Sequence, residues 1–233
     1  MTERTVVVLA PMVSELRPVV KELGLTKRAG SDPPVYEGAL AGWSITATLA
    51  GVGPARAKDA TERVLRDGPV DRVVVVGIAG GVNPDLNIGD VLSPAIIVDG
   101  ATGREWRPAP FGGAAQHGRI ITTDGLSSTP ELLAAGVTAA DMESSAVAEV
   151  CEAHGVAWSV IRVISDRVQD GLVDEDVAAL AKPDGSPDIP AALRYIARNP
   201  GRIGALRRLA RDAKVATTGA ARQLAISLRA DNP

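Results

Sequence analysis

The chain is poor in several residue types that many functional sites need. Cys151 is the single cysteine among 233 residues, so an internal disulfide and a cysteine-based zinc site are both excluded. The two histidines, His117 and His154, fit neither a catalytic triad nor a metal-binding spacing. Aromatic residues make up 3% of the chain, which argues against binding by stacking on several exposed rings. We therefore expect carboxylate chemistry without a metal or cofactor.

Long hydrophobic runs and an excess of positive charge are also lacking. No run is long enough for a membrane span, and the N-terminus leads directly into a strand pattern without a signal-like segment. The formal charge of -3 provides no overall basic field to attract nucleic acid. The sequence predicts a cytoplasmic protein without a nucleic-acid partner.

Short apolar runs alternate with helical patterns along the chain. Strands are predicted over residues 5–10, 35–40, 43–49, 72–76, 90–98, 118–123 and 157–165, and helices over 13–23, 55–65, 142–152 and within the tail 191–228. This alternation predicts an α/β fold with three layers, in which a central mixed sheet lies between helices. The stretch 99–118, between the strands predicted over 90–98 and 118–123, has no hydrophobic periodicity. It predicts a long loop of the kind that borders a site.

An acidic pair lies where the helix over 142–152 is predicted to begin. Asp141 and Glu143 flank Met142. One of the two acids could simply cap the helix, because a carboxylate is favoured at a helix N-terminus. Two acids around a methionine indicate a binding site as well. A glutamate can accept hydrogen bonds from vicinal hydroxyls, and methionine offers a soft apolar wall for a ring.

Two further acids are candidates on weaker grounds. Asp166 ends the last apolar strand directly after Ser165, so burial is expected to raise its pKa, as a general acid requires. Its alternative role is a helix N-cap. Glu15 lies on the first predicted helix, where taken alone a solvated surface position is the better interpretation.

The segment Val76–Gly81 follows a predicted strand and is rich in glycine. It matches neither the dinucleotide-binding fingerprint nor the lysine-containing phosphate loop. Glycines allow a ligand to approach the backbone closely, which makes Ile78, Ala79 and Gly80 candidates for substrate binding. A tight turn explains the same glycines equally well.

Together, three motifs within roughly residues 5–170 resemble the nucleoside phosphorylase/nucleosidase superfamily. The motifs are Val-Val-Gly-Ile-Ala-Gly-Gly-Val from Val75, Asp-Met-Glu-x-x-Ala-Val-Ala from Asp141, and Ile-Arg-Val-Ile-Ser-Asp ending at Asp166. The chain looks most like the methylthioadenosine/S-adenosylhomocysteine nucleosidases and their hopanoid-associated relatives, which act on adenosylhopane. The resemblance implies a nucleoside phosphorylase-like catalytic domain over residues 1–180, with a helical extension over 181–233 packed on it.

The resemblance also implies a role for each candidate residue. Asp166 would protonate or hydrogen-bond N7 of a purine, and Glu15 would orient the attacking water. Glu143 would hold the ribose hydroxyls, and Met142 would pack under the sugar. The remaining substrate-binding candidates are Ile78, Ala79, Gly80, Leu126, Asp141 and Ser165. Two of them depart from the family pattern, since Ile78 replaces a serine and Leu126 replaces an aromatic residue.

Hydrolysis is favoured over phosphorolysis. A phosphorylase needs arginines to hold the phosphate dianion. The arginine-bearing loop expected after the first strand is replaced by Pro11–Glu15, which ends in an acid, although Arg17 and Arg56 keep the phosphorylase possible. The prediction is an N-ribosyl hydrolase for an adenine nucleoside with a 5′ substituent of the methylthioadenosine, S-adenosylhomocysteine or adenosylhopane type. A phosphorylase and a nucleoside-binding protein without turnover are the alternatives.

Two expectations concern partners. Similar nucleosidases are dimers, which implies a homodimer here. Seven basic residues between Arg194 and Lys214 are interleaved with Ile203, Leu206 and Leu209. A basic amphipathic helix can lie on an anionic membrane, whereas a solvated face packed on the core or on a partner subunit is the more common explanation.

Overall fold

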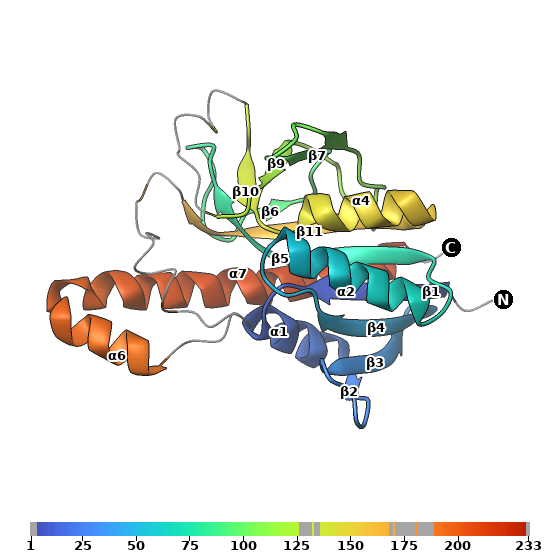
Figure 1. Cartoon of the computed structure of the whole chain (residues 1–233), viewed down its shortest axis with the longest axis horizontal. Coiled ribbons are helices and arrows are strands. Elements are labelled where there is room, and N and C mark those ends of the chain that lie inside the picture. The colour runs from blue at the N-terminus through green and yellow to red at the C-terminus, as the bar shows by residue number, and fades with distance from the viewer. Residues whose placement is uncertain are drawn as a thin grey trace.

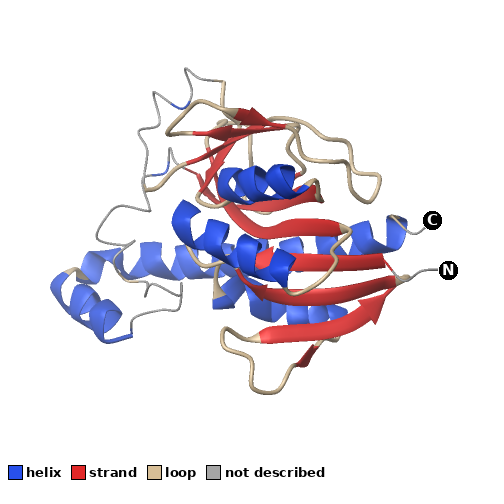
Figure 2. Cartoon of the chain, turned by 45° about the vertical axis from the view of Figure 1, so that its right-hand side comes forward, coloured by secondary structure: helices blue, strands red, loops and turns tan. Residues whose placement is uncertain are grey.

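A central mixed sheet with helices on both faces organises the molecule (Figures 1 and 2). The computed structural model describes residues 4–125, 132, 136–167, 170, 180 and 189–231. The elements are β1 (Arg4–Ala10), α1 (Val13–Leu23), β2 (Thr26–Lys27), β3 (Val35–Leu40), β4 (Trp43–Leu49), α2 (Pro54–Arg66), β5 (Arg72–Gly81), β6 (Val91–Leu92), β7 (Ile96–Asp99), β8 (Glu105–Trp106), β9 (Arg119–Thr122), β10 (Ala139–Asp141), α4 (Ser144–His154), β11 (Ala157–Arg167), α6 (Ile189–Arg198), the 3-10 turn η2 (Pro200–Arg202) and α7 (Ile203–Ala230). The predicted α/β architecture is confirmed.

Strand β5 is the axis of the sheet. It runs parallel to β1 on one side and parallel to β11 on the other, and its end also pairs antiparallel with β10. β4 extends the sheet beyond β1, and β9 and β7 extend it beyond β10. Because β1, β5 and β11 are parallel neighbours, their carboxyl ends meet at one edge of the sheet, where ligands collect in open α/β folds.

Alternation along β5 divides the core into two layers. Val74 and Val76 face a cluster built with α1 and α7, whereas Val73 and Val75 face a cluster built with α2 and α4. All four valines are fully buried. A strand that is apolar on both faces is expected for a sheet covered by helices on each side.

Local signals set the ends of two helices close to the predicted positions. Helix α1 begins after Met12, whose backbone N–H is bonded by the Glu15 carboxylate, and it ends at Gly24 in the left-handed conformation with φ 64°. Helix α4 likewise ends at Gly155, with φ 66°. Glycine adopts this conformation without the strain that a Cβ would cause.

The predicted strand over 90–98 is wrong in its extent. The structure has two short strands there, β6 and β7, separated by a segment that includes Pro94. Proline has no N–H for a strand ladder and so interrupts pairing. The loop predicted over 99–118 contains the short strand β8, which pairs antiparallel with β7.

The C-terminal helices differ along their length. The second half of α7 is buried against α1, β5 and β11 through residues such as Ala220, Leu224 and Leu228. Figure 1 shows α6 and the first half of α7 extending away from the sheet. There Leu206 and Leu209 are half-buried. Among the described helices, none combines the length and the apolar character needed to cross a membrane.

Candidate active site

Glu15 is drawn into the protein by two backbone groups. Its side chain is 2% exposed. One carboxylate oxygen accepts a hydrogen bond from the Met12 N–H, and the other from the Ile78 N–H on β5, both at 2.8 Å. The surface position that helical spacing alone suggested is therefore wrong. Helix α1 follows β1 after only two residues, so its first turn lies over the carboxyl ends of β1 and β5.

Arg162 lies at the centre of the site and was missed from the sequence. It is fully buried on β11. Its Nη2 lies 2.7 Å from Asp141 Oδ2 and 3.0 Å from Glu143 Oε2, and its Nε donates to the same Asp141 oxygen at 3.0 Å. The signal was present, because an arginine inside the apolar run Val160–Ile164 must find anionic partners when the strand is buried.

The two acids around Met142 are held differently. Asp141 accepts hydrogen bonds from the Thr122 hydroxyl at 2.7 Å and from the Ser144 hydroxyl, in addition to Arg162. Glu143 accepts from the Gly53 backbone N–H at 3.1 Å through one oxygen and faces Arg162 with the other. Asp141 is thus surrounded by protein donors, whereas Glu143 retains unused acceptor capacity on both oxygens.

Burial and mutual charge set the protonation of this cluster. Burial raises the pKa of Glu15 to about 8, against the opposing effect of Arg162. Burial also raises the pKa of Glu143, again partly offset by Arg162. The pKa of Arg162 is raised, because the carboxylates of Asp141, Glu143 and Glu15 outweigh the effect of burial. Arg162 is therefore a permanent cation, and Glu15 can take up a proton near neutral pH.

One donor of this cluster has no hydrogen-bond partner among the described residues. This donor is Arg162 Nη1, which is buried. A Cβ at Gly77 would overlap Glu15 Oε1 and come within 2.7 Å of this Nη1. Only a glycine leaves the carboxylate and the guanidinium close to each other here. A small polar molecule between them could donate to Glu15 and accept from Arg162.

Asp166 lies farther along the same strand. It follows Arg162 by four residues, beyond a β-bulge, and pairs with Gly80 of β5. At the usual rise per residue the two lie about 13 Å apart along the strand. The Ser165 hydroxyl donates to Asp166 Oδ1 at 2.6 Å. Burial raises the pKa of Asp166, although the hydrogen bond from Ser165 opposes this.

The other predicted binding residues are distributed around these groups. Ile78 binds Glu15 through its backbone, and its side chain packs in the core layer of α1 and α7. Ala79 belongs to the opposite layer. Gly80 pairs with both Asp166 and Ala140. Met142 is half-buried beside Glu143. Leu126 lies outside the described residues.

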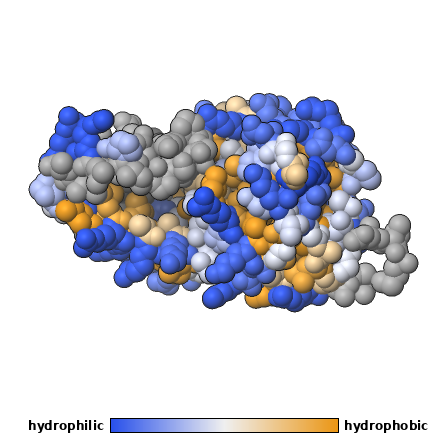
Figure 3. Space-filling model, turned by 90° about the horizontal axis from the view of Figure 1, so that it is seen from below, coloured by the Kyte–Doolittle hydropathy of each residue, from blue (hydrophilic) through white to orange (hydrophobic). Residues whose placement is uncertain are grey.

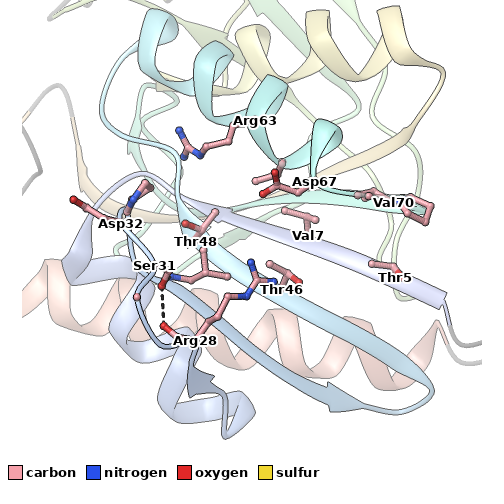
Figure 4. Close-up of a pocket in the computed structure, with 16 residues that line it drawn as sticks. Thr5, Val7, Arg28, Ser31, Asp32, Thr46, Thr48, Arg63, Asp67 and Val70 are labelled. Atoms are coloured by element: carbon pink, nitrogen blue, oxygen red, sulfur yellow. Dashed lines mark hydrogen bonds between the residues drawn. The ribbon is translucent and has the colours of Figure 1, made fainter.

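Among the cavities formed by the described residues, two differ in their relation to the acids. One, of about 630 Å³, lies between α1 and α7 and reaches Met12 and Ile78, whose N–H groups hold Glu15. The other, of about 340 Å³, is formed by β1, β4, the segment 28–35 and the end of α2 (Figure 4). Arg28 and Arg63 face it, but Arg28 is paired with Glu37 and no candidate residue lines it. We assign no chemistry to the second cavity.

A family model and several known proteins match most of the chain. The family model described as the phosphorylase superfamily matches residues 5–114 and 111–183. A 5′-methylthioadenosine/S-adenosylhomocysteine nucleosidase of Shewanella oneidensis is 30% identical over 181 residues, covering 63% of this chain and 77% of the relative. The corresponding protein of Tolumonas auensis is 26% identical, covering 81% and 96%.

Solved structures share the fold at lower identity. The 5′-methylthioadenosine/S-adenosylhomocysteine nucleosidase of Neisseria meningitidis, in complex with methylthio-immucillin-A, has a TM-score of 0.72 at 20% identity and covers 97% of this chain and 99% of its own. The futalosine hydrolase of Helicobacter pylori has a TM-score of 0.71 at 16% identity, covering 96% and 97%. These likenesses extend over nearly the whole chain and support the same architecture.

Proposed function

Because the chain belongs to the phosphorylase superfamily, we propose that it hydrolyses the N-glycosidic bond of an adenine nucleoside with a 5′ substituent. The observation that carries this proposal is the unpartnered Nη1 of Arg162 opposite the Glu15 carboxylate. A buried donor and a buried acceptor that face each other across Gly77 suit one water molecule. That water is the nucleophile of the reaction.

Glu15 acts on the water as general base. Its two backbone hydrogen bonds fix the carboxylate in position. A pKa of about 8 in the free protein lies near the operating range of an efficient base, and positioned proton transfer of this kind contributes roughly 10²–10⁴-fold in rate. Arg162 orients the water oxygen and, together with Glu15, keeps it on one side of the sugar.

Glu143 and Asp166 act on the sugar and on the base. Glu143 has free acceptor capacity for two vicinal hydroxyls, with Met142 as the apolar surface under the ring. Asp166 is protonated more readily than an ordinary aspartate, and since Ser165 donates to Oδ1, the proton belongs on Oδ2. Donated to N7 of the purine, it neutralises the charge that develops on the departing base. The logic is that of glycoside hydrolysis, with one acid and one base on opposite sides of the bond.

Asp141 has a supporting role in this scheme. Its oxygens receive donors from Thr122, Ser144 and Arg162. We infer that it orients Arg162 and does not contact the nucleoside. The sequence predicted Asp141 as a substrate-binding residue, and the Asp141→Asn variant distinguishes the two roles. Loss of an orienting residue lowers kcat more than it raises KM, whereas loss of a binding residue mainly raises KM.

Water is favoured over phosphate by the charge of the site. Three carboxylates surround one arginine, and they would repel a phosphate dianion. Phosphorolysis remains the second candidate. Release of adenine from methylthioadenosine in phosphate-free buffer distinguishes the two, since a phosphorylase requires the anion. No release with or without phosphate, across methylthioadenosine, S-adenosylhomocysteine and an adenosylhopane-type substrate, would support the alternative of a binding protein without turnover.

The decisive variant is Asp166→Asn. We expect kcat for adenine release to fall by roughly 10²–10⁴-fold, with an unchanged circular dichroism spectrum. Asp85→Asn, on an exposed loop, is the matched control and should retain full activity. An Asp166→Asn protein as active as Asp85→Asn would overturn the assignment of the acid.

The remaining parts of the proposal concern partners and substrate. We infer that two copies of the chain form a homodimer. Light scattering tests this, because the molar mass in solution should be twice that of one chain. The 5′ substituent is open between the methylthio, homocysteinyl and hopane types, which parallel assays of the three nucleosides separate.

A further inference from the structure

Charge is distributed unequally between the C-terminal helices and the rest of the chain. Residues 189–231 contain nine arginines and lysines and two aspartates. The remainder has sixteen basic and twenty-six acidic residues. The basic segment is thus a part of this acidic protein that an anionic surface would attract.

The cations of α7 lie along the outer side of the helix. Arg207, Arg208, Arg211, Lys214, Arg222 and Arg229 are all exposed and recur at helical spacing. The first and the last of them lie about 33 Å apart along the helix. Most of the buried residues of α7 occupy the opposite side, against the sheet and α1, although buried Ala225 lies between Arg222 and Arg229. This outer face is called the α7 basic face below.

Few acids of α7 itself neutralise the α7 basic face, although Glu22 of α1 lines the same cavity as Lys214 and Arg222. Asp212 is 8% exposed and pairs with Arg211 at 3.0 Å, and Asp231 pairs with Arg4. Within the described part of the chain, Arg207, Arg222 and Arg229 have no acidic partner. Unpaired exposed cations in a row are expected to attract a partner that carries several negative charges.

Apolar side chains lie beside these cations. Val215 is 51% exposed and Ile226 is 54% exposed, and both project from the same side of α7 as Arg208. On the arm that α6 and α7 form, hydrophilic and apolar groups adjoin each other on the surface (Figure 3). Leu206 and Leu209, by contrast, are half-buried on the other side of the helix, so the interleaving expected from the sequence is carried by different residues.

We propose that the α7 basic face docks on an anionic lipid surface. Headgroup phosphates match the row of arginines, and the acyl boundary accepts Val215 and Ile226. A nucleic acid offers the phosphates but gives little reason for exposed apolar residues between the cations. The lipid surface therefore accounts for both features of the face.

Docking would orient the site as well as attach the protein. Lys214 and Arg222 belong both to the α7 basic face and to the wall of the cavity between α1 and α7. That cavity reaches Met12 and Ile78 next to Glu15. On a membrane its mouth would lie at the lipid–water boundary. This part of the inference rests on the proposed function, whereas lipid binding itself does not.

Vesicle co-sedimentation tests the docking. The intact chain should bind vesicles of phosphatidylcholine mixed with phosphatidylglycerol, fail to bind phosphatidylcholine alone, and be released by salt. Each cation near an anionic surface changes the partition about five-fold. The triple variant with Arg207, Arg208 and Arg229 changed to Gln should therefore bind about 100-fold more weakly.

Controls distinguish this result from general charge effects and from loss of activity. Changing Lys27, Arg66 and Arg107 to Gln removes the same charge from other exposed positions and should leave binding within a few-fold. Hydrolysis of a soluble nucleoside should be unchanged in both triple variants. Val215→Ser with Ile226→Ser should weaken vesicle binding but not binding to a DNA oligonucleotide.

Two outcomes would overturn the proposal. One is the absence of binding to phosphatidylglycerol vesicles at low salt. The other is equal binding to oligonucleotides and vesicles with no effect of the Val215 and Ile226 changes, which would identify a general polyanion site. A catalytically inactive protein that still binds vesicles would refute the proposed function alone.

Discussion

Charged side chains in the cluster around Arg162 and along α7 are of similar kinds but are held in opposite ways. Around Arg162 three acidic side chains meet one guanidinium, and all four are buried. Backbone N–H groups donate to Glu15 and Glu143, and hydroxyl groups donate to Asp141. Along α7 the arginines are exposed and largely without acids. Buried charge is costly unless it is paired, so the acids of the cluster depend on Arg162 and on their other donors, whereas most of the exposed charges of α7 are solvated without acidic partners among the described residues.

The strongest way to break this contrast is Arg162→Met. Removing the guanidinium leaves Glu143 and Asp141 buried without their cation, which should destabilise the fold by about 3–5 kcal/mol. Turnover of the folded protein should fall by at least about 10²-fold, because a donor to the nucleophile is lost. Urea unfolding and adenine release measure the two effects. Arg119→Met, which breaks a surface pair with Glu105, should cost about 1 kcal/mol or less.

Gly77→Ala tests the space between the carboxylate and the guanidinium. The added Cβ would displace Glu15 or Arg162, and overpacking of this kind costs roughly 1–3 kcal/mol. Activity should fall by about 10²-fold, because small displacements of catalytic groups are expensive. Gly204→Ala on α7 has open space around it and should leave activity intact while stabilising the helix slightly. Equal behaviour of the two variants would mean that Gly77 is merely a tolerant position.

Glu15 connects the cluster to pH. Its folded-state pKa of about 8 lies above the ordinary value of 4.5, so between these values the folded state binds more protons than the unfolded state. Stability should therefore fall as pH rises from about 5 to about 8. The Glu15→Gln protein should show a flatter dependence of Tm on pH over this window. A slope identical to that of the wild type would show that Glu15 is already ionised at pH 5.

The smallest expected effect belongs to the α7 basic face. Changing Arg207, Arg208 and Arg229 to Gln should alter the free energy of unfolding by less than about 0.5 kcal/mol, as is usual for exposed positions. The same change should affect vesicle binding strongly. A large loss of stability would show that these arginines are structural, and the contrast with the buried cluster would disappear.

Much of the fold could be predicted from local pattern. Strands such as β3 and β4, and helix α1, have the predicted bounds, because alternation and caps are local properties of the sequence. The prediction of one strand over 90–98 merged β6 and β7, because apolar residues continue on both sides of Pro94. The sequence also placed the glycine segment at the end of β5 without showing that the strand continues through it to Gly81.

The site was predictable only in part. Glu143 and Asp166 could be proposed from the sequence because an acid at a helix start and an acid at a strand end are conspicuous. The burial of Glu15 and the central position of Arg162 depend on contacts between α1, β5, α4 and β11, which are distant in sequence. Helical spacing shows which face of α1 Glu15 occupies. It does not show that the backbone N–H of Ile78 on β5 lies against that face.

The end of β5 has one more consequence. Gly80 pairs with Asp166 of β11 and with Ala140 of β10, whose neighbour Asp141 leads into Glu143. Asp166 on β11 and Ala140 on β10 therefore lie on either side of β5, two strand spacings or about 10 Å apart. In the proposed reaction, the hydrogen bonds of β5 would hold the acid for the base and the acid for the sugar at this interval, whichever nucleoside the surrounding side chains admit.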